Sequence, residues 1–247
     1  MREIRITEKE QGHDHLSASL IYQTFRVTLG AGHWILQTPF ALMIICTGLV
    51  FDSIIRMLTT MNSQYYRMIA LPEASYGFIG SAVALLGIVL PLVALKLVKH
   101  RSPGFNFGLM SALTLAGLMG VTGVIPVLGL IPIILLSSVM YLLRFFMSHY
   151  LNRITSSHQR ATVLSFKGLA FNLAYGLMGI SYSFLLAYPQ LQIQVPWLQT
   201  QGKGPADITF IASLPWFPLI FVFCLTVLLL FAKWKVKDVD FFGVMKE

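Results

Sequence analysis

Charged residues are scarce in this sequence. Of its 247 residues, 11% are Asp, Glu, Lys or Arg, whereas a soluble domain carries roughly 25%. Hydrophobic residues make up 56% of the chain, and its mean hydropathy is +0.72. These proportions exclude an ordinary soluble domain and indicate a membrane protein.

Cysteine is nearly absent, and the motifs of membrane-embedded proteases are missing. Cys46 and Cys224 both lie in apolar runs, so we expect buried apolar side chains and no disulfide framework. The sequence contains neither the Gly-x-Ser-Gly of six-helix serine proteases nor the His-Glu-x-x-His of zinc proteases. The His-Asp-His at 13–15 has no third ligand at a suitable spacing. We therefore expect no enzyme activity, no metal site and no cofactor.

Long apolar runs dominate what is present. A helix needs about 20 residues to cross the hydrocarbon of a bilayer, and alternating strand patterns are lacking. The sequence therefore predicts an all-α membrane protein whose single transmembrane domain covers residues 37–235, between cytoplasmic segments at 1–36 and 236–247. The six predicted spans are Phe40–Thr59, Tyr76–Val98, Phe107–Ile125, Val127–Phe146, Gly168–Ala187 and Thr209–Ala232.

Prolines and small residues add detail to these spans. Only Pro126 separates the third span from the fourth, which predicts a tight helical hairpin, and Pro215 with Pro218 predicts a bend or an outer end in the last span. Small residues recur at every fourth position of the third span, which is typical of close helix packing in lipid. That row serves either internal packing or a dimer contact; it comprises Gly108, Ala112, Ala116 and Gly120.

The basic residues predict the orientation of the chain. With the N-terminus in the cytoplasm, Arg56, Arg67 and Lys203 lie outside, and the other 15 of the 18 lysines and arginines lie inside. Both termini are thus predicted to be cytoplasmic, in a cell membrane of the bacterial inner-membrane type. The formal net charge of +8 then follows from topology and from attraction to anionic lipid, so we expect the bilayer and no nucleic acid as a partner.

An acid and a base interrupt the first span. Asp52 lies about 4 Å beyond the midplane at 1.5 Å per residue, and Arg56 stands one turn further out on the same helix face. A charge at this depth costs about 2.5–3.5 kcal/mol on insertion scales. Two interpretations remain open: the pair neutralises itself inside the bundle, or Asp52 faces a water-filled cavity and binds a proton or a cationic substrate.

Two other spans carry polar faces. The fourth has Tyr141 and Arg144 on one face, and the fifth contributes Asn172. Three helices with polar stripes favour a shared aqueous path through the bundle. The candidate residues for a substrate or proton path are Asp52, Arg56, Tyr141, Arg144 and Asn172.

Two segments resemble bacterial transporters of the major facilitator superfamily. Residues 150–179, above all the Arg-Ala-Thr-Val-Leu-Ser of 160–165, resemble the loop and helix after the family's tenth span. Residues 65–101 are similar to its seventh-to-eighth connection and eighth span. The resemblance implies that the six helices are spans seven to twelve, half of a twelve-helix bundle, with a linker-like segment at 1–36. It also implies secondary active transport of a small solute, coupled to protons, with Asp52 as a proton or cation site.

The same resemblance implies a partner. Carriers of this family bind their substrate between two halves, so this chain is expected to be a half or truncated carrier that works with a separate N-terminal half or as a homodimer. The alternative is a six-helix membrane subunit with an assembly or regulatory role and no transport activity.

Overall fold

The computed structural model describes residues 30, 32–157, 159–188, 190 and 204–235, and within these ranges the chain is helical, without a strand. Six helical stretches are long and apolar enough to cross a membrane, which indicates a multi-pass membrane protein. The elements are α2 Pro39–Thr60, α3 Asn62–Met68, the short 3-10 helix η1 Glu73–Ser75, α4 Tyr76–His100, α5 Pro103–Thr122, α6 Leu130–Ile154, α7 Arg160–Ala187, α8 Pro205–Ser213 and α9 Trp216–Lys235.

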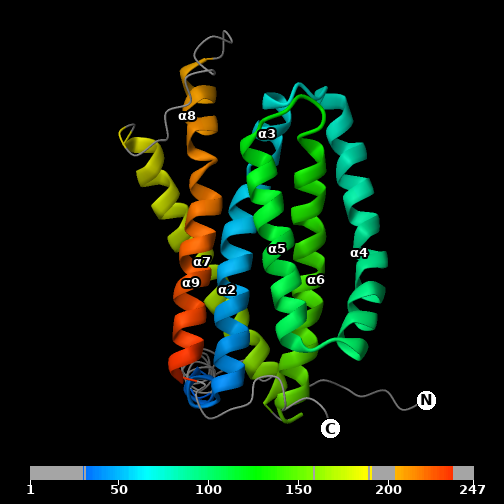
Figure 1. Cartoon of the computed structure of the whole chain (residues 1–247), viewed down its shortest axis with the longest axis vertical. Helices are drawn as coiled ribbons and strands as arrows, with labels where there is room; N and C mark the ends of the chain where they lie inside the picture. The colour runs from blue at the N-terminus through cyan, green and yellow to red at the C-terminus, as the bar shows by residue number, and fades with distance from the viewer. Residues whose placement is uncertain (1–29, 31, 158, 189, 191–203, 236–247) are drawn as a thin grey trace, which may run out of the picture.

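The long helices run alternately up and down the longest axis of the molecule (Figure 1). The beginning of α2 and the end of α9 therefore lie at one end of the bundle. Basic residues of the described chain gather at that end, among them Lys99, Arg101, Arg153, Arg160 and Lys233. The predicted segments 1–36 and 236–247 fall almost wholly outside the described residues, apart from a helical stretch at 32–37.

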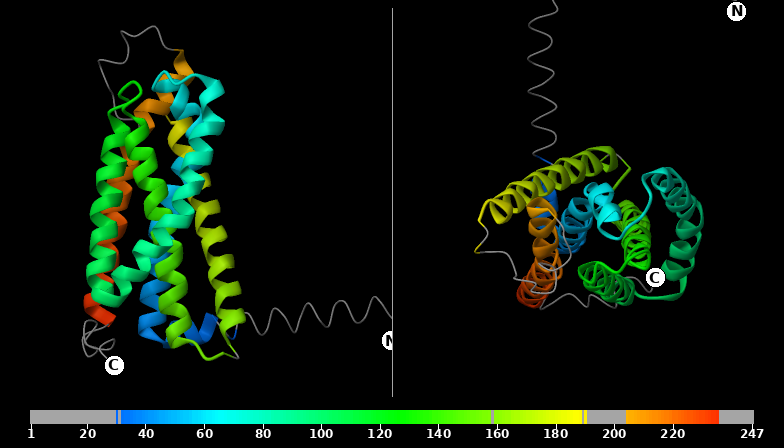
Figure 2. Two further views of the ribbon diagram at one scale, coloured as in Figure 1. Left: turned by 90° about the vertical axis from the view of Figure 1, so that its right-hand side faces the viewer. Right: turned by 90° about the horizontal axis from the view of Figure 1, so that it is seen from above.

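Helices α2 and α6 form the centre of the bundle. α2 packs against α6, α7 and α9, while α6 also packs against α4 and α5. An aromatic pair contributes to the contact between α2 and α9: the rings of Phe51 and Phe221 pack edge to face, with centroids 5.2 Å apart. α7 and α4 flank the central pair on different sides (Figure 2), and each has only 6% of its most apolar window buried. Within the described part of the chain, these two spans thus have few fully buried residues.

Several helix boundaries differ from the sequence prediction. α7 begins at Arg160, eight residues before the predicted Gly168, and α6 continues eight residues past the predicted Phe146 to Ile154. The prediction was wrong here because it ended each span where polar residues begin. A helix satisfies its own backbone hydrogen bonds and continues into the polar membrane interface regardless of hydropathy.

The predicted helical hairpin around Pro126 is present, because α5 and α6 pack against each other, but its connection is longer than one residue. α5 ends at Thr122 and α6 starts at Leu130, so a loop of residues 123–129 joins them. Val124 and Val127 adopt positive φ angles of 45° and 58° in this loop. The Val127 N–H donates to the Ile69 carbonyl at 2.9 Å. This hydrogen bond ties the loop to the segment that follows α3.

The last span is divided into two helices. α8 ends at Ser213 and α9 begins at Trp216. Pro215 lies between them and lacks an N–H, so it cannot donate to the Ile211 carbonyl; the Leu214 and Phe217 N–H groups instead donate to the carbonyls three residues back. The predicted bend is therefore present, as a break between two helices of a span that runs from Pro205 to Trp234.

The row of small residues on α5 does not line the interior. All four residues of that row are exposed, and Gly108 has no neighbour within 4 Å of where a Cβ would stand. Gly120, by contrast, approaches Pro132 of α6. Internal packing uses the opposite face, where a Cβ on Gly117 would lie 2.8 Å from the Leu136 side chain.

A buried hydrogen bond joins α5 to α6. The Asn106 Nδ2 donates to the Tyr150 hydroxyl at 2.8 Å, and both side chains are almost fully buried. We expect Tyr150→Phe to lower the free energy of unfolding by about 1 kcal/mol, since interhelical hydrogen bonds in membranes average about 0.6 and reach about 1.7 kcal/mol. Reversible unfolding in mixed SDS–maltoside micelles measures this loss.

The matched control is Tyr76→Phe. The Tyr76 hydroxyl is buried without a hydrogen-bond partner, so its removal is expected to leave stability unchanged or slightly higher. Equal losses in the two variants would contradict the role given to the Asn106–Tyr150 bond.

Candidate functional site

The ion pair that the sequence predicts on α2 is present. The Arg56 Nη2 lies 2.9 Å from the Asp52 Oδ2, and the Asp52 side chain is 9% exposed. This Oδ2 atom receives no well-directed hydrogen bond, so the contact is ionic and the carboxylate retains unused acceptor capacity. Asp52 lies about 4 Å from the middle of α2 at 1.5 Å per residue. The pair therefore sits deep within a membrane-length helix.

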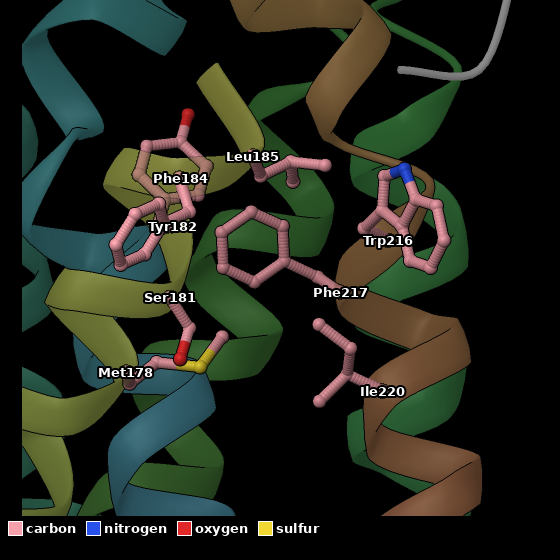
Figure 3. A pocket seen from close by; sticks show the side chains of 8 residues that line it. All are labelled: Met178, Ser181, Tyr182, Phe184, Leu185, Trp216, Phe217 and Ile220. Carbon is pink, nitrogen blue, oxygen red and sulfur yellow. The ribbon is translucent and has the colours of Figure 1, made fainter. Parts of the chain in front are cut away.

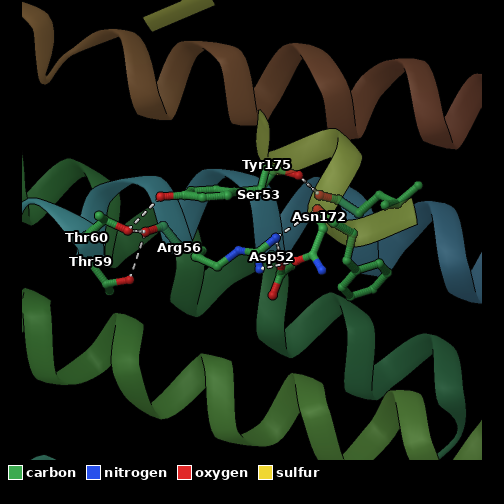
Figure 4. Close-up of polar contacts among 9 residues, drawn as sticks. Asp52, Ser53, Arg56, Thr59, Thr60, Asn172 and Tyr175 are labelled. Atoms are coloured by element: carbon green, nitrogen blue, oxygen red, sulfur yellow. Dashed lines mark hydrogen bonds and ion pairs between the residues drawn. The ribbon is translucent and has the colours of Figure 1, made fainter. Parts of the chain in front are cut away.

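Helix α7 holds Arg56 in place. The Arg56 Nη1 donates to the Asn172 Oδ1 at 3.1 Å, and Nη2 donates to the Phe171 carbonyl at 2.8 Å. The guanidinium also lies 4.3 Å from the centroid of the Tyr175 ring, within cation–π range. Figure 4 shows Arg56 of α2 beside Asn172. Arg56 is thus a clamp between α2 and α7.

Two further cations act on Asp52. Arg144 of α6 and Lys167 of α7 both interact electrostatically with its carboxylate, as Arg56 does, and they also act on each other. Arg144 is exposed and lies about 3 Å from the middle of α6 at 1.5 Å per residue. We call Asp52, Arg56, Arg144 and Lys167 the midspan charge cluster.

An apolar contact lies one helical turn from Asp52, toward the start of α2. Gly48 has no side chain, and Met147 of α6 and Phe171 of α7 both close on it: a Cβ there would lie 2.6 Å from the Met147 Cε and from the Phe171 Cζ. The Lys167 Nζ lies 5.7 Å from the centroid of the same Phe171 ring. Because α7 begins at the basic end of the bundle, the Lys167 backbone lies on the basic-end side of this apolar contact, and Asp52 lies on its other side.

The structure brings most, but not all, of the predicted site residues together. Asp52, Arg56 and Asn172 are in one connected group, and Arg144 interacts with it through its charge. Tyr141 instead packs at the contact between α4 and α6, where a Cβ on Gly87 would lie 2.9 Å from its ring. Its place in a path with Asp52 is not supported by any described contact.

Two members of the site are absent from the sequence prediction. Lys167 was assigned to a cytoplasmic loop, because the fifth span was expected to begin at Gly168. Tyr175, whose hydroxyl lies 3.1 Å from the Thr60 hydroxyl, was not singled out. Its signal was available, since Tyr175 stands three residues after Asn172 on the same helix face. Lys167 carried no such signal, because a Lys beside a loop is ordinary.

A separate pocket lies between α7 and α9, with a volume of about 190 Å³ (Figure 3). Tyr182, Phe217 and Trp216 are among the side chains around it. The Tyr182 hydroxyl pairs with the Ser213 hydroxyl at 2.9 Å, and the Ser181 hydroxyl donates to the Leu177 carbonyl. No charged residue lines this pocket. Polar recognition is therefore better served by the midspan charge cluster.

Comparisons with known proteins do not add to this geometry. No family model matches the chain, and neither the curated proteins nor the solved structures contain a significant match. Within the described part of the chain, no group of three or more His, Cys, Asp or Glu side chains is arranged to hold a metal ion.

Proposed function

We propose that this chain is one half of a secondary carrier that moves a small solute across a bacterial inner membrane. The observation that carries the proposal is the midspan charge cluster, which gathers four ionisable side chains from three membrane-length helices. Ionisable residues at membrane depth are costly, face a bundle interior or a water-filled cavity, and typically mark solute or ion paths. The family resemblance of residues 65–101 and 150–179 supports the same function.

Polar residues exposed on the surface of the bundle support the need for a second polypeptide that completes the solute path. Arg144 is exposed near the middle of α6, and Asn172 is exposed near the middle of α7. Lipid acyl chains cannot solvate a guanidinium, so water or another polypeptide has to cover this face. A separate N-terminal half or a second copy of the chain, packed over the sparsely buried α4 and α7, would enclose an aqueous path.

The proposal includes an orientation of the bundle in the membrane. The basic residues at the end of the bundle that holds Pro39 and Lys233 favour a cytoplasmic location for that end. A structural subunit is the second candidate function, and the clamp of Arg56 onto α7 favours it. In that case the charges would only fix helix packing.

Water access to Arg144 separates the two candidates. In a background where Cys46 and Cys224 are replaced by alanine, we expect Arg144→Cys to react readily with a water-soluble maleimide in open membrane fragments. The control is Ala112→Cys, which is exposed at the middle of α5, a helix without charged residues. It should react at least about tenfold more slowly, because a thiol in lipid is neither hydrated nor ionised. Protection of both cysteines would overturn the carrier proposal.

A further inference from the structure

The midspan charge cluster is not electrically balanced. It contains three basic side chains and one carboxylate, so its formal charge is +2. Within the described ranges the only other acidic residues are Glu73 and Asp207, and both lie near helix ends, away from the middle of the spans. The described chain therefore offers no second carboxylate at this depth.

The four groups are also not equally engaged. The ion pair between Asp52 and Arg56 is the only one found within 4.0 Å in the described chain. Both terminal nitrogens of Arg56 are already engaged, Nη2 with Asp52 and α7 and Nη1 with α7. Arg144 and Lys167 make no hydrogen bond or ion pair within this part of the structure, although the Lys167 Nζ lies 5.7 Å from the centroid of the Phe171 ring. Two cationic heads thus keep their hydrogen-bond donors unused.

The unused hydrogen-bond donors of Arg144 and Lys167 and the net positive charge of the cluster favour binding of an anion. A guanidinium presents a planar fork of donors that fits a carboxylate, and a nearby ammonium adds a point charge. Asp52 alone would attract a cationic solute, but the net positive charge of the cluster would repel it. The half-buried Phe171 ring, whose centroid lies 5.7 Å from the Lys167 Nζ, favours an organic anion over an inorganic one, because an aromatic side chain offers dispersion and apolar burial.

We infer that the midspan charge cluster binds a small organic anion, whose carboxylate is held by Arg144 and Lys167 while Arg56 remains tied to Asp52 and α7. This inference rests on the proposed carrier function, since the anion has to reach the cluster through water. The substrates of the carrier are then small carboxylates.

Charge-selective labelling tests the inference. In the cysteine-free background, Asn172→Cys places a thiol on the exposed side of α7 next to Arg56 while leaving all four charges in place. The reagents are an anionic sulfonatoethyl and a cationic trimethylammonioethyl methanethiosulfonate, applied to open membrane fragments. The reference thiol is Leu128→Cys, in the exposed and uncharged loop 123–129.

The measured quantity is the labelling rate with the anionic reagent divided by the rate with the cationic reagent. This ratio is expected to be at least about tenfold higher at Asn172→Cys than at Leu128→Cys, because a cleft of one charge sign concentrates ions of the opposite sign by about 10- to 1,000-fold. Arg144→Gln or Lys167→Gln should each lower this ratio at least about threefold. Lys99→Gln, which removes the same charge from the end of α4, should leave it unchanged. Sodium succinate should slow labelling by either reagent more than sodium chloride of equal ionic strength.

Two results overturn the inference in different ways. Labelling at a ratio equal to or below the reference shows water access without anion preference, and it defeats the anion site while the carrier proposal stands. Labelling by neither reagent defeats the aqueous path, and with it both proposals. Protection by putrescine instead of succinate would assign the cluster to cations and contradict the role given to Arg144 and Lys167.

Discussion

Replacing Asp52 by alanine is expected to lower the free energy of unfolding by about 3 kcal/mol. Removing one partner of a buried ion pair typically costs about 3–5 kcal/mol, because the other charge is left buried and uncompensated. The lower end applies here because the Arg56 side chain keeps 27% exposure and its contacts with α7. Reversible unfolding in mixed SDS–maltoside micelles measures the difference.

A double variant separates charge from packing. Asp52→Leu with Arg56→Met removes both charges and keeps similar volumes, so it should recover at least half of the loss seen with Asp52→Ala. Ser53→Ala is the neighbouring control: its hydroxyl donates only to the Leu49 carbonyl of the same helix, and its effect should stay within about 1 kcal/mol. A double variant as unstable as Asp52→Ala would mean that lost packing, and not an unpaired Arg56, causes the effect.

A side chain at Gly48 is expected to force α2 away from its neighbours. Gly48→Val should lower the free energy of unfolding by about 2–3 kcal/mol, in the range of overpacked cores. The first added carbon already meets the Met147 Cε and the Phe171 Cζ at 2.6 Å. Met147 can rotate away at low cost, whereas the Phe171 ring is held between α2 and the Lys167 side chain. Thermal unfolding in maltoside micelles, followed by circular dichroism, measures the loss.

Glycine replacement elsewhere provides the comparison. Gly48→Ala should be close to neutral, because the gain of about 1 kcal/mol in helix propensity offsets a similar overpacking cost. Gly179→Val, at a position on α7 with no atom within 4 Å of a Cβ, should not destabilise the protein. If Gly179→Val and Gly48→Val lose stability equally, the cause is the β-branched residue in a helix and not the contact with Met147 and Phe171.

The number of spans and their approximate positions follow from the sequence alone. Hydrophobicity adds up along a chain, and a bilayer requires about 20 apolar residues for each crossing, so six runs could be found without any knowledge of packing. The pairing of Asp52 with Arg56 followed equally directly, since residues four apart on a helix are neighbours. The break at Pro215 was visible because proline acts on its own backbone.

Only the tertiary structure decided which helices share the site. Asn172 is 116 residues from Arg56 along the chain, and no local pattern sets the rotation of α7 against α2. The same reason explains the misplaced Tyr141, the exposed row of small residues on α5 and the overlooked Lys167. Helix rotation depends on which side chains interlock, as Gly48 does with Met147 and Phe171. The sequence determined that charges enter the membrane; the packing of three helices decided that Arg144 and Lys167, besides Arg56, act electrostatically on one carboxylate.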